Sequence, residues 1–249
     1  KGNIVNAVAK SEELSEDGLT HTYKLRKDVK WTNGDPVTAH DFVYEWQCIF
    51  RKKGSYYYMF ADGIAGIEGA QELSDKIDAG EELTDDDLNS MGVKAIDDYT
   101  LEVKTTVRVS FFDELMAFPC FFPINEKFCE KQGDKYGKSA KAILGNGAFI
   151  MTNWEPGSIA EFKKNEDYYE AKTVKIEKLV MKLVQNPKVA AQSFMAGETD
   201  YAPITSDLVG KYKDDESFKQ VPEGFLYYLS VNFQNADLAN ANIRQAVSL

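Results

Sequence analysis

The chain has 249 residues, with 29 lysine and arginine side chains against 40 aspartates and glutamates, which gives a formal net charge of −11 at pH 7. This acidic excess repels phosphate backbones and anionic lipid headgroups, so nucleic acid is not an expected partner. The length allows one large domain or two ordinary ones, and no stretch is apolar for long enough to predict a membrane-spanning helix.

The first predicted elements are a strand and a tight turn. His21, Tyr23 and Leu25 alternate with polar residues, which is typical of a half-buried strand. Asn33 and Gly34 follow, and both residues tolerate the positive φ angles that a chain reversal requires. The sequence therefore predicts that the chain turns back after a strand.

A capped amphipathic helix is predicted directly after this turn. Thr38 is placed as the N-cap, with Asp41 three residues later as in a capping box. The helix carries one apolar stripe, formed by Phe42, Val43, Trp46, Ile49 and Phe50. Trp46, together with Trp31 upstream, is therefore predicted to lie in a core.

The next part of the chain predicts short alternating helices and strands. The acidic run 81–87 resembles a helix start, with Thr84 as the cap and acids that complement the helix dipole. Residues 101–104 predict a strand and residues 111–118 a short apolar helix. This pattern indicates a mixed α and β lobe, and the polar and glycine residues that follow place its boundary near residue 138.

A new pattern begins after residue 145. Segments 148–153 and 159–164 flank a Pro-Gly turn and predict a β-hairpin, and residues 174–184 predict a further strand. A helix is expected from Asn186, the cap, to Gly197, with Phe194 and Met195 facing inward. A second short helix is expected at 206–213.

The segment 225–233 predicts a strand with two different faces. Its first face is an apolar row expected in a core, made of Phe225, Tyr227, Leu229, Val231 and Phe233. The opposite face carries Tyr228, Ser230 and Asn232, which suit a polar cleft with aromatic lining. These three residues are candidate ligand contacts.

No catalytic or metal site is expected. The two histidines, His21 and His40, have no plausible triad partners, and the sequence contains no nucleophile motif or phosphate loop. The cysteines, Cys48, Cys120 and Cys129, form no metal-binding spacing. Cys120 and Cys129 are either paired or free, and the sequence predicts a protein that is not an enzyme and needs no cofactor.

Several motifs resemble one family in combination. The run Lys-Trp-x-x-Gly-x-Pro-Val-Thr-Ala-x-Asp-Phe-Val at 30–43 is similar to the signature of the oligopeptide and dipeptide solute-binding proteins of bacterial ABC importers, family 5. Asn-Gly-Ala-Phe at 146–149 and the Tyr-Tyr strand at 227–228 resemble other segments of this family. Asn-Ile-Arg-Gln-Ala at 242–246 departs from its pattern, because only one of the usual arginines is present.

The resemblance implies an α/β (mixed α+β) fold with periplasmic-binding-protein-like type II lobes and an extra small domain, incomplete in this chain. By the family layout, residues 1–138 correspond to the extra small domain, 139–222 to part of the first lobe and 223–249 to the crossover into a truncated second lobe. The chain begins at Lys1 and ends inside an amphipathic segment, so we interpret it as a fragment.

The family also implies a function. Such proteins capture oligopeptides outside the cytoplasmic membrane and deliver them to ABC permease subunits, sometimes from a lipid anchor. The tyrosine-containing loop of the family corresponds here to Tyr56 and Tyr57, which join Tyr228, Ser230 and Asn232 as expected ligand contacts. Alternatives are binding of a murein peptide, a sugar or nickel, or sensing of a peptide pheromone. A fragment without its second lobe is expected to self-associate through an exposed apolar face.

Overall fold

The computed structural model describes residues 4–221 and 228–248 and divides into two compact units, Lys1–Leu183 and Val184–Leu249. We describe each unit by itself. The predicted boundaries near residues 138 and 222 follow the family layout and stay predictions.

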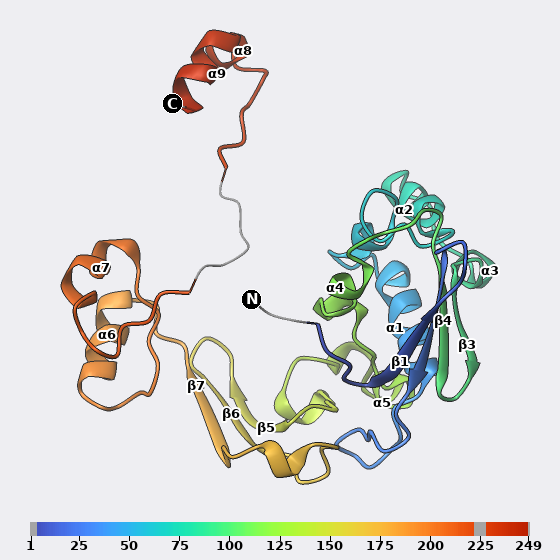
Figure 1. Cartoon of the computed structure of the whole chain (residues 1–249), viewed down its shortest axis with the longest axis horizontal. Helices are drawn as coiled ribbons and strands as arrows, with labels where there is room; N and C mark the ends of the chain where they lie inside the picture. The colour runs from blue at the N-terminus through green and yellow to red at the C-terminus, as the bar shows by residue number, and fades with distance from the viewer. Residues whose placement is uncertain (1–3, 222–227, 249) are drawn as a thin grey trace. The chain divides into compact units, whose positions relative to one another are not determined.

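The first unit contains a four-stranded antiparallel sheet (Figure 1). Its strands are β1 (Ala9–Leu14), β2 (Thr20–Leu25), β3 (Val93–Asp97) and β4 (Thr100–Lys104), in the order β1-β2-β4-β3. In β2, His21, Tyr23 and Leu25 are buried and their neighbours are more exposed, which confirms the predicted alternation. Strand β1 was not predicted, because its polar sequence shows no apolar alternation.

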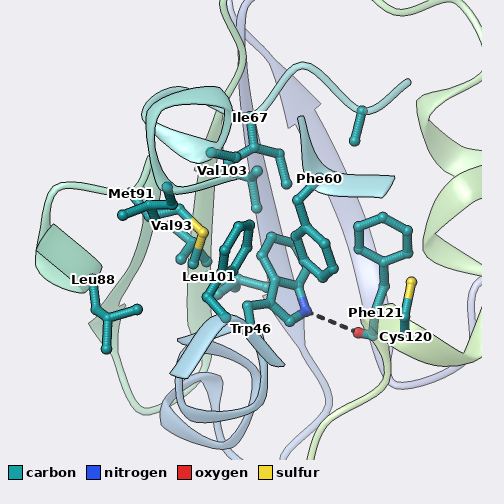
Figure 2. Close-up of a cluster of buried hydrophobic side chains, with 14 of the residues drawn as sticks. Trp46, Phe60, Ile67, Leu88, Met91, Val93, Leu101, Val103, Cys120 and Phe121 are labelled. Carbon is teal, nitrogen blue, oxygen red and sulfur yellow. Dashed lines mark hydrogen bonds between the residues drawn. The ribbon is translucent and has the colours of Figure 1, made fainter. Parts of the chain in front are cut away.

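Helix α1 (Ala39–Arg51) packs against β3 and β4 and carries the centre of the core. The predicted N-cap is confirmed, since the Thr38 backbone N–H donates to Asp41 Oδ2 at 2.8 Å. Trp46 and Phe50 are fully buried. Figure 2 shows the Trp46 indole N–H donating to the Phe121 carbonyl, at 3.1 Å. This bond satisfies the indole donor inside the apolar cluster.

Short helices and 3₁₀ turns complete this part of the unit. They are η1 (Tyr57–Phe60), α2 (Ala70–Asp78), α3 (Asp85–Asn89), α4 (Phe112–Met116), η2 (Pro119–Phe121), α5 (Glu126–Gln132), η3 (Gly133–Lys135) and η4 (Ala140–Ala142). The predicted cap of α3 is confirmed, because Thr84 Oγ1 accepts from the Asp87 N–H at 3.1 Å. The predicted apolar helix at 111–118 is also present, although α4 covers only its middle.

The first unit also contains a three-stranded antiparallel sheet with the order β5-β6-β7. β5 (Phe149–Glu155) and β6 (Ile159–Lys164) form the predicted hairpin around Gly157, whose φ of 79° suits glycine. A 3₁₀ turn, η5 (Ala171–Thr173), leads to β7 (Lys178–Lys182), which is shorter than the predicted strand 174–184. All five residues of β7 are exposed, so this edge of the sheet is uncovered.

A second, small apolar cluster lies between the loop before α1 and the start of the second sheet. Val29, Trp31 and Val37 are buried there, with Leu144 and Tyr169 packed against them. The burial of Trp31 and Trp46 confirms that both tryptophans belong to cores. This cluster joins the two sheets of the first unit.

In the second unit, the described residues form helices α6 (Pro187–Met195), α7 (Ser206–Tyr212), α8 (Ala236–Ala239) and α9 (Ala241–Ser248). The predicted cap is confirmed, since Asn186 Oδ1 accepts from the Lys188 N–H at 2.9 Å. Met195 is 56% exposed, so the prediction that it faces inward was wrong. The buried positions of α6 are Ala190 and Ala191, and Phe194, the other residue predicted to face inward, is partly buried.

Candidate functional site

The tyrosine run after α1 is the first predicted contact region. Tyr56 and Tyr58 are 46% and 50% exposed, whereas Tyr57 is partly buried at the start of η1. The Tyr57 hydroxyl donates a hydrogen bond to Asp78 Oδ1, and this bond raises the pKa of Tyr57. The hydroxyl of Tyr57 is therefore engaged within the protein, while Tyr56 offers its ring to solvent.

Tyr56 belongs to an exposed aromatic patch, defined here as Tyr56, Tyr58 and Phe118. The Phe118 ring meets Tyr56 edge to face, with ring centroids 5.5 Å apart, and the Tyr58 ring lies 6.4 Å from Tyr56. Phe118 is 36% exposed and comes from the segment between α4 and η2. Sequence reasoning missed Phe118, because it was treated as part of an apolar helix and no local signal pairs it with Tyr56.

The patch is anchored to the main core. Directly after Phe118, η2 places Phe121 in the core, where its ring centroid lies 4.5 Å from that of Phe60. Phe60 closes η1, the 3₁₀ turn that begins directly after Tyr56. Because both chain segments are fixed by buried neighbours, the patch presents flat apolar area with little rotamer freedom to lose. Such a surface suits binding.

The second predicted contact region lies in the second unit. Tyr228 is 80% exposed, Ser230 is exposed, and Asn232 Oδ1 accepts from the Gln234 N–H at 3.0 Å. The structure brings these three residues together in one exposed segment, and it brings Tyr56 and Tyr57 together in the first unit.

The strand predicted at 225–233 is not present over residues 228–233. Leu229 and Phe233 are 74% and 65% exposed, so the prediction of a buried apolar row was wrong for these residues. A strand needs a neighbour to pair its backbone groups, and the described part of this unit contains only helices. Residues 225–227 lie outside the described residues.

Cysteines and metal-ligating side chains are the other groups that could carry chemistry. All three cysteines are free and buried, which answers the open question about Cys120 and Cys129. Burial raises the pKa of the Cys120 thiol to about 12 and also raises that of Cys48, so neither is a reactive thiolate. Within residues 4–221 and 228–248, no three metal-ligating side chains cluster, and no helix is long and apolar enough to cross a membrane.

The comparisons with known proteins agree on one family. The model of bacterial extracellular solute-binding proteins, family 5 (middle region), matches residues 3–249. The oligopeptide-binding protein OppA of Bacillus subtilis (strain 168) is 32% identical over 252 residues, covering 99% of this chain and 44% of that protein.

Solved structures give the same result. The substrate-binding domain of an oligopeptide ABC transporter from Bacillus anthracis str. Ames is 37% identical, with a TM-score of 0.75 over 85% of this chain and 39% of that one. Haemophilus influenzae OppA in complex with RPPGFSPFR is 30% identical, with a TM-score of 0.75. The match covers 96% of this chain and 46% of that one. The chain thus spans less than half the length of these relatives. Its fold is the expected type II periplasmic-binding-protein fold in part, and the chain belongs to family 5 of the bacterial extracellular solute-binding proteins.

Proposed function

We propose that the protein containing this chain binds oligopeptides outside the cytoplasmic membrane and delivers them to the permease of an ABC importer. The observation that carries the proposal is the similarity to oligopeptide-binding OppA, which extends over 99% of the chain. The relative from Haemophilus influenzae was solved with a peptide bound. A lipid anchor on the full protein belongs to the same proposal.

The proposal assigns each part of the chain to a domain of the full-length protein. Residues 1–138 act as the extra small domain, 139–222 as part of the first lobe and 223–249 as the crossover into the second lobe. A peptide is held between lobes that close about a hinge. The edge strand β7, whose five residues are all exposed, supports this layout, because a lobe sheet needs further strands beside it.

The proposed peptide contacts are Tyr56 and Tyr57 from the small domain and Tyr228, Ser230 and Asn232 from the crossover. Tyr56 and Tyr228 are supported by their exposure, since each ring can stack on a peptide side chain while its hydroxyl stays hydrated. Tyr57 has the weakest support among the tyrosines, because its hydroxyl already donates to Asp78.

The experiment that tests the function is native mass spectrometry of the full-length protein purified without added ligand. We expect a set of copurified peptides with mixed sequences. A copurified sugar, a nickel ion or one single pheromone-like peptide would contradict broad oligopeptide capture.

Two substitutions test the contacts by calorimetry with a peptide identified in this way. Tyr56→Ala and Tyr228→Ala should each weaken binding by about tenfold, since burying one aromatic contact contributes roughly 1–2 kcal/mol. Tyr201→Ala is the matched control, because Tyr201 is 79% exposed and is not a proposed contact. Unchanged affinity in both site variants would remove these tyrosines from the site.

For the 249-residue chain alone, we propose weak peptide binding and self-association. Its support is the exposed apolar surface at β7, where Val180 and Met181 are 40% and 57% exposed. Sedimentation velocity over a range of concentrations should show dimers or larger species. A monomer at all concentrations would contradict the self-association.

A further inference from the structure

A lysine and a cysteine from two helices meet at the end of α1. Cys129 lies in the middle of α5, which packs against α1, and Lys52 is the residue at which α1 ends. The Nζ atom of Lys52 donates to the Sγ atom of Cys129 at 4.0 Å. The two residues are 77 positions apart in the chain, so the tertiary fold creates this contact.

A thiol is an unusual partner for a lysine in so acidic a chain. The two neighbours of Lys52 form ion pairs, Arg51 with Asp85 at 3.1 Å and Lys53 with Glu82 at 3.3 Å. Within the described part of the chain, Lys52 itself forms no ion pair with a carboxylate. Its ammonium group is therefore directed to the sulfur and not to an acid.

Backbone hydrogen bonds hold both residues in place. The Lys52 N–H donates to the carbonyl of Cys48 at 2.9 Å. The Cys129 N–H donates to the carbonyl of Asn125 at 2.9 Å, and Asn125 Oδ1 caps α5 by accepting from the Phe128 N–H at 2.8 Å. Cys129 is 2% exposed, whereas Lys52 is exposed. The sulfur is thus fixed in position and lies one side chain away from solvent.

We propose that Lys52 and Cys129 form a covalent cross-link between α1 and α5 when the protein is oxidised by hydrogen peroxide. In the first step, the thiol of Cys129 takes one oxygen atom and is oxidised to a sulfenic acid, while the peroxide is reduced to water. In the second step, the Lys52 ammonium releases a proton to water and the amine attacks the sulfur. A sulfur–nitrogen bond forms and the sulfur–oxygen bond breaks. The hydroxyl group leaves as water with one amine proton, and the product is a sulfenamide. Sulfenic acids condense in the same way with backbone nitrogens.

Cys48 is the competing nucleophile for the sulfenic acid. It lies on α1 one helical turn before Lys52 and is 7% exposed, and its thiol would give a disulfide in place of the sulfenamide. The observed contact favours Lys52, because its nitrogen is already held beside the sulfur of Cys129 and a positioned nucleophile reacts as if it were highly concentrated.

The cross-link would close a covalent loop from residue 52 to residue 129. This loop contains Tyr56, Tyr58 and Phe118, which form the aromatic patch. Oxidation therefore constrains the chain segments that carry the patch. The proposal concerns the described part of the chain and does not depend on the function proposed above.

Tryptic peptide mapping of the 249-residue chain, with and without hydrogen peroxide and without reductant, tests the cross-link. Trypsin cuts after Arg51, so Cys48 and Lys52 fall in different peptides. We expect peptide 52–53 joined to peptide 128–131, with the summed mass of both less two hydrogen atoms. Dithiothreitol should separate the two peptides. The urea midpoint of the oxidised chain should rise and return after reduction, because the link restricts the unfolded chain.

One variant and one matched control decide the role of the amine. Lys52→Arg keeps the charge at an exposed position, but the guanidinium stays protonated and cannot attack. The sulfenic acid of Cys129 should then persist and react with dimedone, whereas the wild type should show little dimedone labelling. Lys53→Arg should form the cross-link as the wild type does.

Three results would overturn the proposal. They are peptide 31–51 joined to peptide 128–131, which would show a disulfide with Cys48, equal dimedone labelling of Cys129 in the wild type and Lys52→Arg, and an unmodified Cys129 after treatment with peroxide. None of these results bears on whether peptides bind.

Discussion

At the residue scale, Asp41 explains much of the run between the first strand and α1. It is 7% exposed, and its Oδ2 atom accepts from the Trp31 indole N–H at 3.2 Å, the Thr38 N–H at 2.8 Å and the Thr38 hydroxyl at 3.2 Å. One carboxylate thus fixes the start of α1 and the tryptophan of the second core. These three hydrogen bonds explain why the motif at 30–43 contains Trp31, Thr38 and Asp41.

Asp41→Ala should lower the free energy of unfolding by roughly 2–4 kcal/mol, because it leaves buried donors without an acceptor. Asp41→Asn should lower it less, since the amide oxygen still accepts. Urea titration followed by tryptophan fluorescence measures both changes. As a control, Asp98→Ala removes only an exposed ion pair with His40, at 3.4 Å, and should change stability by less than about 0.5 kcal/mol. Equal effects of Asp41→Ala and Asp98→Ala would contradict this role.

Glu45 is a second residue whose contribution can be measured, because its titration makes the stability of the chain depend on pH. Burial raises its pKa from 4.5 to about 7, while the Lys52 ammonium opposes the shift. Because an acid with a raised pKa binds its proton more tightly in the folded state, its contribution to stability is full below pH 4.5 and is lost as the pH rises through about 7.

Glu45→Gln should therefore stabilise the chain by roughly 1–3 kcal/mol at pH 8 and leave it nearly unchanged at pH 4.5. Urea midpoints of the wild type and the variant, measured at several pH values, give the difference directly. As a control, Glu13→Gln changes an exposed carboxyl, and its urea midpoints should follow those of the wild type at every pH. Parallel profiles for Glu45→Gln as well would show that this carboxyl titrates normally.

At the element scale, α6 depends on its cap. Asn186 Oδ1 accepts from the Lys188 and Val189 N–H groups at 2.9 and 3.4 Å, and Pro187 occupies the first helical position, where no N–H is needed. Few buried side chains support this helix, so the cap is a large share of what holds it.

Asn186→Ala should weaken α6 by about 1 kcal/mol, and its amides should exchange about fivefold faster. Asn186→Asp keeps an acceptor oxygen and should preserve the protection. Hydrogen exchange of residues 190–195 measures both variants. Equal protection in Asn186→Ala and the wild type would mean that packing alone holds the helix.

The elements that the sequence predicted are those with local signals. The cap residues Thr38, Thr84 and Asn186 and the turn at Gly157 each act within a few residues, and each was found. An alternating pattern was sufficient for β2, which pairs with β1 and β4, but the strand expected at 225–233 has no partner strand in the described part of its unit. The same reason applies to the candidate site: exposure of Tyr56 could be inferred, but its contact with Phe118 arises only when α4 and η1 fold together.

At the scale of the whole molecule, the two units differ in how much apolar surface they bury. The first unit has a large cluster around Trp46 and Phe50 and a second around Trp31. Among the described residues of the second unit, the buried apolar side chains are Ala190, Ala191 and Leu208. Burial of two alanines and one leucine cannot offset the entropy of ordering some sixty residues, because backbone ordering opposes folding by about 1–2 kcal/mol per residue.

We therefore expect residues 1–183 to fold alone and residues 184–249 to remain unfolded when each is expressed separately. The first piece should unfold cooperatively in urea, with the fluorescence of Trp31 and Trp46 reporting the transition. The second should show amide exchange near the intrinsic rate. Cooperative unfolding of 184–249 alone would contradict this expectation, because two buried alanines and one buried leucine would then suffice as a core.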